Sequence, residues 1–258
     1  MERSEYDKLD SVENRMWWFA ARNRNLLMLS RRLPSKPGCW PTLDAGSPTL
    51  DAGSGTGGFL SRLAVDDPER VLLGLDIDPL ACRRAAAKSG RPLCAGSVNS
   101  LPFPDGAFAV IFSLDVLCHR DVDEYGALLQ FHRCLAKHGW LIVNLPAYQW
   151  MLSQHDVAVH NVRRYTMAGV ARLLNTAGFR CVYATYWNTL LFPVMAITRK
   201  LLPRRIRPTS DVMPYPNPID ALCRAVTTFE TLPLRVGLRL PFGGSVLALA
   251  AKKASIDG

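Results

Sequence analysis

The chain has 258 residues, and 48% of them are hydrophobic, which is enough to bury the core of one α/β domain. Its net charge of +9 is unevenly placed, because residues 1–161 carry 17 Lys+Arg against 18 Asp+Glu and residues 162–258 carry 14 against 4. The seven cysteines form no Cys-x-x-Cys pair, so they indicate neither a zinc site nor a disulfide framework and point to a reducing cytoplasm. The polar, acidic start is unlike a signal peptide.

A helical pattern over residues 5–33 opens the chain, and strands and helices then alternate. The expected strands are 48–52, 71–76, 92–95, 108–113, 139–145, 180–186 and 244–250, and the expected helices are 57–65, 79–88, 123–136, 166–176 and 219–240. This order predicts an α/β fold with a doubly wound, mostly parallel seven-stranded sheet of Rossmann-like form, covered by helices on both faces.

A glycine-dense turn follows the first expected strand, with the sequence Asp51-Ala52-Gly53-Ser54-Gly55-Thr56-Gly57-Gly58. Gly53, Gly55 and Gly57 let the backbone take positive φ and approach a ligand closely, at the turn where open α/β sheets bind ligands. Gly53, Gly55 and Gly58 also fit the G-x-G-x-x-G pattern of dinucleotide sites. Asp51 favours S-adenosylmethionine (SAM), because a carboxylate attracts its ammonium and sulfonium and repels a pyrophosphate.

Residues 43–49 nearly repeat residues 50–56, with Pro48 where the second copy has Gly55. Proline fixes φ and lacks an N–H, and only the second copy continues into further glycines and a helix. We therefore assign ligand binding to the second copy.

The second expected strand ends at Asp76. It lies about twenty residues beyond the glycines, where such a unit places a carboxylate on the ribose hydroxyls. Asp78-Pro79 then opens the next helix with a capping residue and a proline in its first turn.

Five motifs in order resemble the class I SAM-dependent methyltransferases, over roughly residues 43–185. They are Leu50–Phe59, Gly74–Pro79, Leu101–Phe108, Asp115–His119 and Leu135–Val143. The chain looks closest to the small-molecule, type 11-like branch, which has an L-P-F-P-D-x-x-F signature. The resemblance implies SAM as cofactor, S-adenosylhomocysteine as product, and a last strand that pairs antiparallel at the sheet edge.

The resemblance also implies the positions that hold the cofactor. These are Asp51, Gly53, Ser54, Gly55 and Gly57 for the methionine end, Asp76 and Ile77 for the ribose, Ser97 and Val98 for the adenine, and Leu114 and Asp115 for the floor. The family often has an acid at the position of Ser97, and a serine hydroxyl is a weaker acceptor. An N-terminal helix commonly covers the cofactor in this family, so Trp18 is expected to wall the pocket and Arg22 to lie near the methionine carboxylate, with core packing as the alternative.

A polar segment follows the fifth expected strand, at the edge of the sheet where the donor methyl group should point. His155 is the candidate general base, with Asp156 beside it. The candidate substrate contacts are Tyr148, His160, Arg163, Arg164 and Tyr165. The two arginines would suit an anion, and Asp156 would orient His160 if the segment were helical. A purely structural or metal-binding role is the alternative, although no metal is expected, and methyl transfer can proceed by positioning alone.

An apolar run over residues 190–197 precedes Arg199-Lys200 and Arg204-Arg205-Ile206-Arg207. It is shorter than the roughly twenty residues that a membrane-spanning helix needs. Such a stretch can lie on an anionic membrane surface or receive a lipid-linked or phosphorylated substrate, or it can pack over the active site. The charge pattern does not suggest nucleic-acid binding.

The sequence thus predicts a single SAM-dependent methyltransferase domain for a small-molecule or lipid-linked acceptor, with transfer to O, N or C. Its expected parts are an N-terminal helical cap (1–35), a cofactor-binding core (43–186), a helical insertion or substrate cap (187–242) and a final strand (243–252). The alternatives are a methyltransferase-fold protein that binds SAM without methylating or acts as a partner, and an NAD(P)-dependent oxidoreductase. The expected location is cytoplasmic, with peripheral membrane contact through 190–207 as an option.

Overall fold

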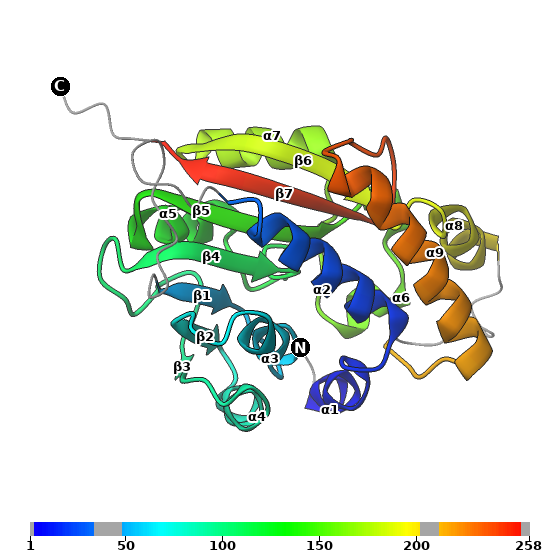
Figure 1. Cartoon of the computed structure of the whole chain (residues 1–258), viewed down its shortest axis with the longest axis horizontal. Coiled ribbons are helices and arrows are strands. Elements are labelled where there is room, and N and C mark those ends of the chain that lie inside the picture. Colours follow the sequence, from blue (N-terminus) through cyan, green and yellow to red (C-terminus); the bar gives the residue numbers. More distant parts are fainter. Residues whose placement is uncertain (1–2, 34–47, 202–211, 254–258) are drawn as a thin grey trace.

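The computed structural model describes residues 3–33, 48–201 and 212–253 of the chain. Its centre is a seven-stranded sheet with the strand order β3-β2-β1-β4-β5-β7-β6 (Figure 1). The strands are β1 (Thr49–Ala52), β2 (Leu72–Asp76), β3 (Leu93–Ala95), β4 (Phe108–Leu114), β5 (Leu135–Pro146), β6 (Phe179–Trp187) and β7 (Ser245–Lys252). All run parallel except β7, which lies antiparallel between β5 and β6. The predicted α/β fold class is confirmed.

Helices cover both faces of this sheet. They are α1 (Arg3–Val12), α2 (Trp17–Ser30), α3 (Gly58–Asp66), α4 (Pro79–Ser89), α5 (Glu124–Cys134), α6 (Gln154–Ala158), α7 (Met167–Thr176), α8 (Phe192–Leu201) and α9 (Asn217–Arg235). One apolar core joins α2, α3 and α9 to one face, and the other core joins α5 and α7 to the opposite face. The central strands β1 and β4 are buried along their whole length, as expected of parallel strands with helices on both sides.

Two sequence-based expectations about elements were wrong. The helix expected over 5–33 is divided into α1 and α2 by a turn over residues 13–16, where Glu13 accepts a hydrogen bond from Thr56 Oγ1 at 2.7 Å. The final strand is one place in from the sheet edge, and β6 forms the edge instead. Residues 246–251 of β7 are apolar and buried, so this strand gains by having a neighbour on each side.

The fold brings one end of the sheet under several helices. The strands β1, β2, β4 and β5 end on the side where α1, α6, α8 and α9 gather (Figure 1). Residues 43–47 of the first repeat copy and residues 204–207 lie outside the described residues. Among the helices that are described, none is long and apolar enough to cross a bilayer.

Candidate functional site

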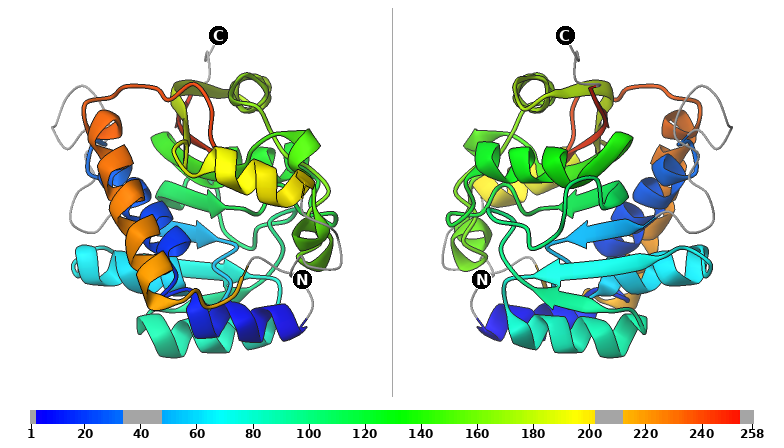
Figure 2. Two further views of the ribbon diagram at one scale, coloured as in Figure 1. Left: turned by 90° about the vertical axis from the view of Figure 1, so that its right-hand side faces the viewer. Right: turned by 90° about the vertical axis from the view of Figure 1, so that its left-hand side faces the viewer.

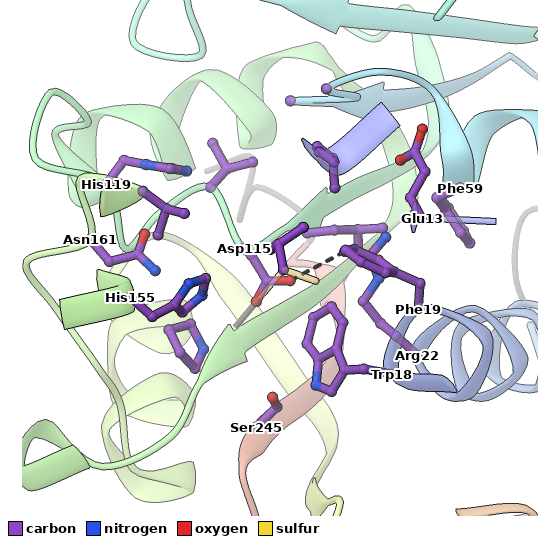
Figure 3. Close-up of a pocket in the computed structure, with 18 of the residues that line it drawn as sticks. Glu13, Trp18, Phe19, Arg22, Phe59, Asp115, His119, His155, Asn161 and Ser245 are labelled. Carbon is purple, nitrogen blue, oxygen red and sulfur yellow. Dashed lines mark hydrogen bonds and ion pairs between the residues drawn. The ribbon is translucent and has the colours of Figure 1, made fainter. Parts of the chain in front are cut away.

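A cavity of about 580 Å³ lies at the carboxyl ends of β1, β2, β4 and β5. This volume is typical of small-molecule sites, which span about 300–1,000 Å³. The cavity has two parts, which we call the glycine lobe and the histidine lobe. The glycine lobe is lined by Asp51, Gly53, Gly55 and Asp76, and the histidine lobe by His119, His155 and Asn161 (Figure 3). Asn188 also lines the cavity. In Figure 3, Asp115 lies between the labelled residues of the histidine lobe and those of α2.

The glycine turn has the positive φ angles that its sequence predicts. They are +88° at Gly53, +54° at Gly55 and +88° at Gly57. A Cβ at Gly53 would lie 2.2 Å from Val116 Cγ2, and a Cβ at Gly57 would lie 2.6 Å from the Cα of Ala85 in α4. Gly57 therefore serves the packing of α3 on α4 and does not line the cavity, whereas Gly53 and Gly55 do.

Asp51, the last residue but one of β1, is a buried carboxylate that lines the cavity. Asp51 is 1% exposed, and neither of its carboxylate oxygens has a hydrogen-bond partner among the described residues. Burial raises the pKa of Asp51 to about 7, while the nearby Arg22 guanidinium opposes this rise. A buried acceptor without a partner is costly, so this position fits a ligand that brings a cationic donor.

Asp76 ends β2 and holds both the glycine turn and α1. Its Oδ2 accepts from the Gly55 N–H at 2.8 Å, and its Oδ1 accepts from the Asp78 N–H at 3.0 Å and from the Tyr6 phenol at 3.2 Å. Burial raises the pKa of Asp76. Because each carboxylate oxygen has two lone pairs, Oδ2 retains the capacity to accept from a ligand hydroxyl.

Arg22 reaches from α2 to the floor of the cavity. Its Nη1 lies 3.3 Å from Asp115 Oδ2, the contact dashed in Figure 3, and its guanidinium lies 5.3 Å from the Trp18 ring centroid. Asn144 donates to both oxygens of Asp115, at 2.9 and 3.1 Å, and accepts from Trp187 Nε1 at 2.8 Å. This buried chain fixes the position of Asp115, which has a φ of +59°.

Most positions expected to hold the cofactor line this one cavity. Besides those of the glycine lobe, they are Ser54, Ile77, Ser97, Val98, Leu114, Asp115, Trp18 and Arg22. Sequence reasoning missed four lining residues from α1 and the turn after it, Tyr6, Leu9, Glu13 and Met16. The only available signal was the helical pattern of the N-terminal segment, which does not say which of its residues face the cavity.

Two polar side chains of the cavity lining, His119 and Asn188, are uncharged at pH 7. Burial lowers the pKa of His119 to about 4, so its imidazole is neutral at pH 7. Asn188 is 1% exposed, and neither atom of its side-chain amide has a hydrogen-bond partner among the described residues. Asn188 was also missed from the sequence, because nothing near it in the chain marks the end of β6 as part of the site.

The structure corrects the role expected for Asp156. Its carboxylate accepts from Arg164 Nε at 2.9 Å and Nη2 at 3.0 Å, and from the Ser153 N–H at 2.8 Å. Asp156 is completely buried and does not line the cavity. The helix α6 ends before His160, so Asp156 orients Arg164 rather than His160.

Four of the five expected substrate contacts lie outside the cavity lining, which runs counter to their prediction. They are Tyr148, His160, Arg163 and Tyr165. Arg163 donates to the carbonyls of His119 and Val122, and the Tyr165 phenol donates to Glu124 Oε2 at 2.6 Å. These side chains hold the polar segment onto the loop after β4. Arg164 does line the cavity, although its charge is already paired with Asp156.

Residues 50–143 match a family model described as a methyltransferase domain. This match covers the glycine turn, Asp76 and Asp115, whose geometry is given above. A comparison with curated proteins found no match to this chain.

Several solved structures share the fold of this chain. A chain in the complex of the Haloferax volcanii Trm112 methyltransferase activator is 18% identical with a TM-score of 0.60, covering 98% of this chain and 100% of its own. The cyclase SpnF is 19% identical with a TM-score of 0.59, covering 94% and 84%. A SAM-dependent methyltransferase from Thermotoga maritima is 17% identical with a TM-score of 0.57, covering 97% and 96%. At these identities the likeness shows the class I methyltransferase fold.

Proposed function

We propose that the chain binds SAM in the glycine lobe and transfers its methyl group to an acceptor in the histidine lobe. The observation that carries this proposal is the carboxylate of Asp51, which is buried, faces the cavity and has no partner among the described residues. The α-ammonium of SAM would supply the missing donor and a favourable charge.

The charges of the glycine lobe support SAM over a dinucleotide. Asp51, Asp76 and Asp115 line it with Arg22 as the cation among them. Burial raises the pKa of all three carboxyl groups, so their negative charge is disfavoured unless a further cation joins Arg22 in the lobe. A pyrophosphate would add two negative charges to this site, whereas the ammonium and sulfonium of SAM would relieve the repulsion.

The positions of the remaining lining residues fit the parts of SAM. Asp76 would accept from the ribose hydroxyls through its Oδ2, and Ser97 with Val98 would flank the adenine. Arg22 and Trp18 would close the methionine end from α2, where the guanidinium is already positioned over the Trp18 ring.

The acceptor side needs chiefly to position a nucleophile and exclude water. When bound, SAM supplies an activated methyl group that passes to an acceptor lone pair, leaving a thioether and a proton to be lost by the acceptor. His155 and the neutral His119 line the lobe and could accept that proton, directly or through water. The amide of Asn188 would orient the acceptor through one donor and one acceptor atom.

Mass spectrometry of whatever ligand copurifies would test this proposal, followed by incubation with SAM and candidate acceptors. We expect His155→Ala to lower turnover and leave the affinity for S-adenosylhomocysteine unchanged, because the two sites are separate lobes. Binding of SAM with no methylated product from any acceptor would favour the alternative of a non-methylating protein with this fold.

A further inference from the structure

Helix α9 carries its apolar side toward solvent. Ile219, Leu222, Phe229 and Leu232 are all exposed, with Leu222 at 63% and Phe229 at 67%. The buried side of the same helix is largely polar, with Thr227, Glu230, Thr231 and Leu234 against the body of the protein. Glu230 is 5% exposed and accepts from the N–H groups of Thr189 and Leu190, at 2.7 and 3.0 Å. This is the reverse of an ordinary surface helix, whose apolar stripe faces the core.

Helix α8 presents a second apolar surface at the same end of the molecule. Val194 and Ile197 are 60% and 55% exposed, and both helices face the viewer in the left-hand view of Figure 2. Trp150 lies beside α8, with its ring 6.0 Å from that of Phe192 and 5.9 Å from Lys200 Nζ. We call the exposed apolar side chains of these elements the α8–α9 surface, which consists of Trp150, Val194, Ile197, Ile219, Leu222, Phe229 and Leu232. Exposed apolar side chains that gather at one end of a protein mark interaction sites.

The exposed charged side chains described on α8, on α9 and in the turn after α9 have one sign. Lys200, Arg235 and Arg239 are exposed. The acidic side chains described between residues 162 and 253 are Asp220 and Glu230, and both turn inward, where Asp220 pairs with Arg224 Nε at 2.5 Å. Apolar side chains flanked by cations fit the anionic surface of a membrane. A second copy of this chain would bring like charges together, which disfavours a dimer through this surface.

The cavity reaches the α8–α9 surface. Val194 of α8 and Ile219 of α9 line the cavity, yet they are 60% and 47% exposed. Leu191 and Met195 of α8 continue this apolar lining, and Thr198 and Arg199 of the same helix lie beside it, so part of the entrance wall is apolar. A molecule with an apolar chain would therefore meet matching side chains from the surface to the histidine lobe.

We propose that the α8–α9 surface docks on an anionic membrane and that the histidine lobe takes its acceptor, an amphiphile with an apolar chain, from the lipid phase. The docking depends only on this surface. The choice of acceptor rests on the proposed methyltransferase function, so the two are tested by separate measurements.

Sedimentation of the full chain with vesicles tests the docking, without SAM or acceptor. Phosphatidylcholine vesicles are compared with vesicles that also contain phosphatidylglycerol, at low and at high salt. We expect tighter binding to the anionic vesicles, weakened by salt. Leu222→Glu with Phe229→Glu should lower the partition coefficient at least about tenfold, since two large apolar contacts are lost.

The matched control is Val65→Glu with Val71→Glu, which adds the same charge at exposed valines elsewhere. It should bind as the wild type does. The milder Phe229→Ser and the charge variant Lys200→Gln with Arg235→Gln should each weaken binding, and unchanged thermal unfolding would show that every variant is folded.

Two results would overturn the docking proposal. One is equal binding by the wild type and the Leu222/Phe229 variant. The other is a wild-type dimer in sedimentation velocity that Phe229→Glu returns to a monomer, because a second copy would then cover the surface. Calorimetry on the same preparations measures the binding of S-adenosylhomocysteine to the glycine lobe independently. Failure of docking and failure of the proposed function are therefore distinguishable.

Discussion

The phenol of Tyr6 donates to Asp76 Oδ1 at 3.2 Å and so joins the first helix of the chain to the carboxyl end of β2. Burial and the Asp76 carboxylate raise the pKa of Tyr6, which keeps the phenol protonated as a donor. Lys88 of α4 pairs with Asp10 and Glu13 on the same side. Helix α1 therefore covers the glycine lobe. A ligand that leaves the lobe on this side requires the hydrogen bond of Tyr6 and the ion pairs of Lys88 to break.

We expect Tyr6→Phe to speed the dissociation of S-adenosylhomocysteine about fivefold to tenfold. The hydrogen bond lost is one to a charged acceptor, worth about 1–1.5 kcal/mol in holding α1 closed. Stopped-flow displacement would measure the rate. Tyr125→Phe, at an exposed tyrosine of α5, is the control and should leave it unchanged. Equal dissociation rates for the Tyr6 variant and the wild type would show that α1 does not limit ligand release.

Arg164 has a structural role that can be measured as stability. Arg164→Leu should lower the free energy of unfolding by about 3–5 kcal/mol, because Asp156 would remain buried without its partner. Urea unfolding checks this value, and Arg172→Leu, at an exposed arginine of α7, should change it by less than about 0.5 kcal/mol. Adding Asp156→Leu to the Arg164 variant should recover part of the loss. A loss below about 1 kcal/mol would mean that the ion pair is not maintained in solution.

His119 should make the protein less stable in mild acid. Its pKa is about 4 in the folded chain against an ordinary 6.5, so the unfolded chain binds the proton more strongly. The stability it contributes is complete above about pH 6.5 and is lost as the pH falls toward 4, by on the order of 2–3 kcal/mol. Unfolding free energies across this range, compared with His119→Gln, isolate the effect. The same pH dependence in both proteins would contradict the burial of a neutral imidazole.

Gly57 is needed for packing rather than for ligand contact. Gly57→Ala should lower the free energy of unfolding by about 1–3 kcal/mol more than Gly90→Ala does. Both glycines have positive φ, but only at Gly57 would the new methyl group lie against the α4 backbone. Thermal unfolding of the two variants makes the comparison. Equal losses of unfolding free energy in the two variants would show that α3 and α4 can move apart without a free-energy cost.

The sequence predicted the parts of the site that depend on local pattern. The glycine turn and Asp76 follow buried strands, and the carboxyl ends of neighbouring parallel strands meet at one edge of a sheet, so their proximity could be inferred. The unequal roles of Gly53 and Gly57 could not, because they depend on Val116 and Ala85 from other elements.

Contacts between distant segments could not be predicted. The polar composition of residues 153–165 indicated a catalytic and substrate-binding segment. The pairing of Asp156 with Arg164 could not be predicted, because it depends on how the loop after α6 folds back. The bond of Tyr6 to Asp76 spans 70 residues, and that of Trp187 to Asn144 spans 43. The apolar pattern of α9 would have predicted a stripe facing the core, whereas the structure turns it to solvent.

Calorimetry at several pH values, with S-adenosylhomocysteine and with NAD, tests the central claim that Asp51 receives the ammonium of a SAM-type cofactor. We expect S-adenosylhomocysteine to bind with an affinity on the order of micromolar and NAD not to bind. Because burial raises the pKa of Asp51 to about 7, binding should weaken and displace a proton as the pH falls below 7, and Asp51→Asn should bind weakly with no such dependence. Tighter binding of NAD than of S-adenosylhomocysteine, or an unchanged pH profile in Asp51→Asn, would contradict it.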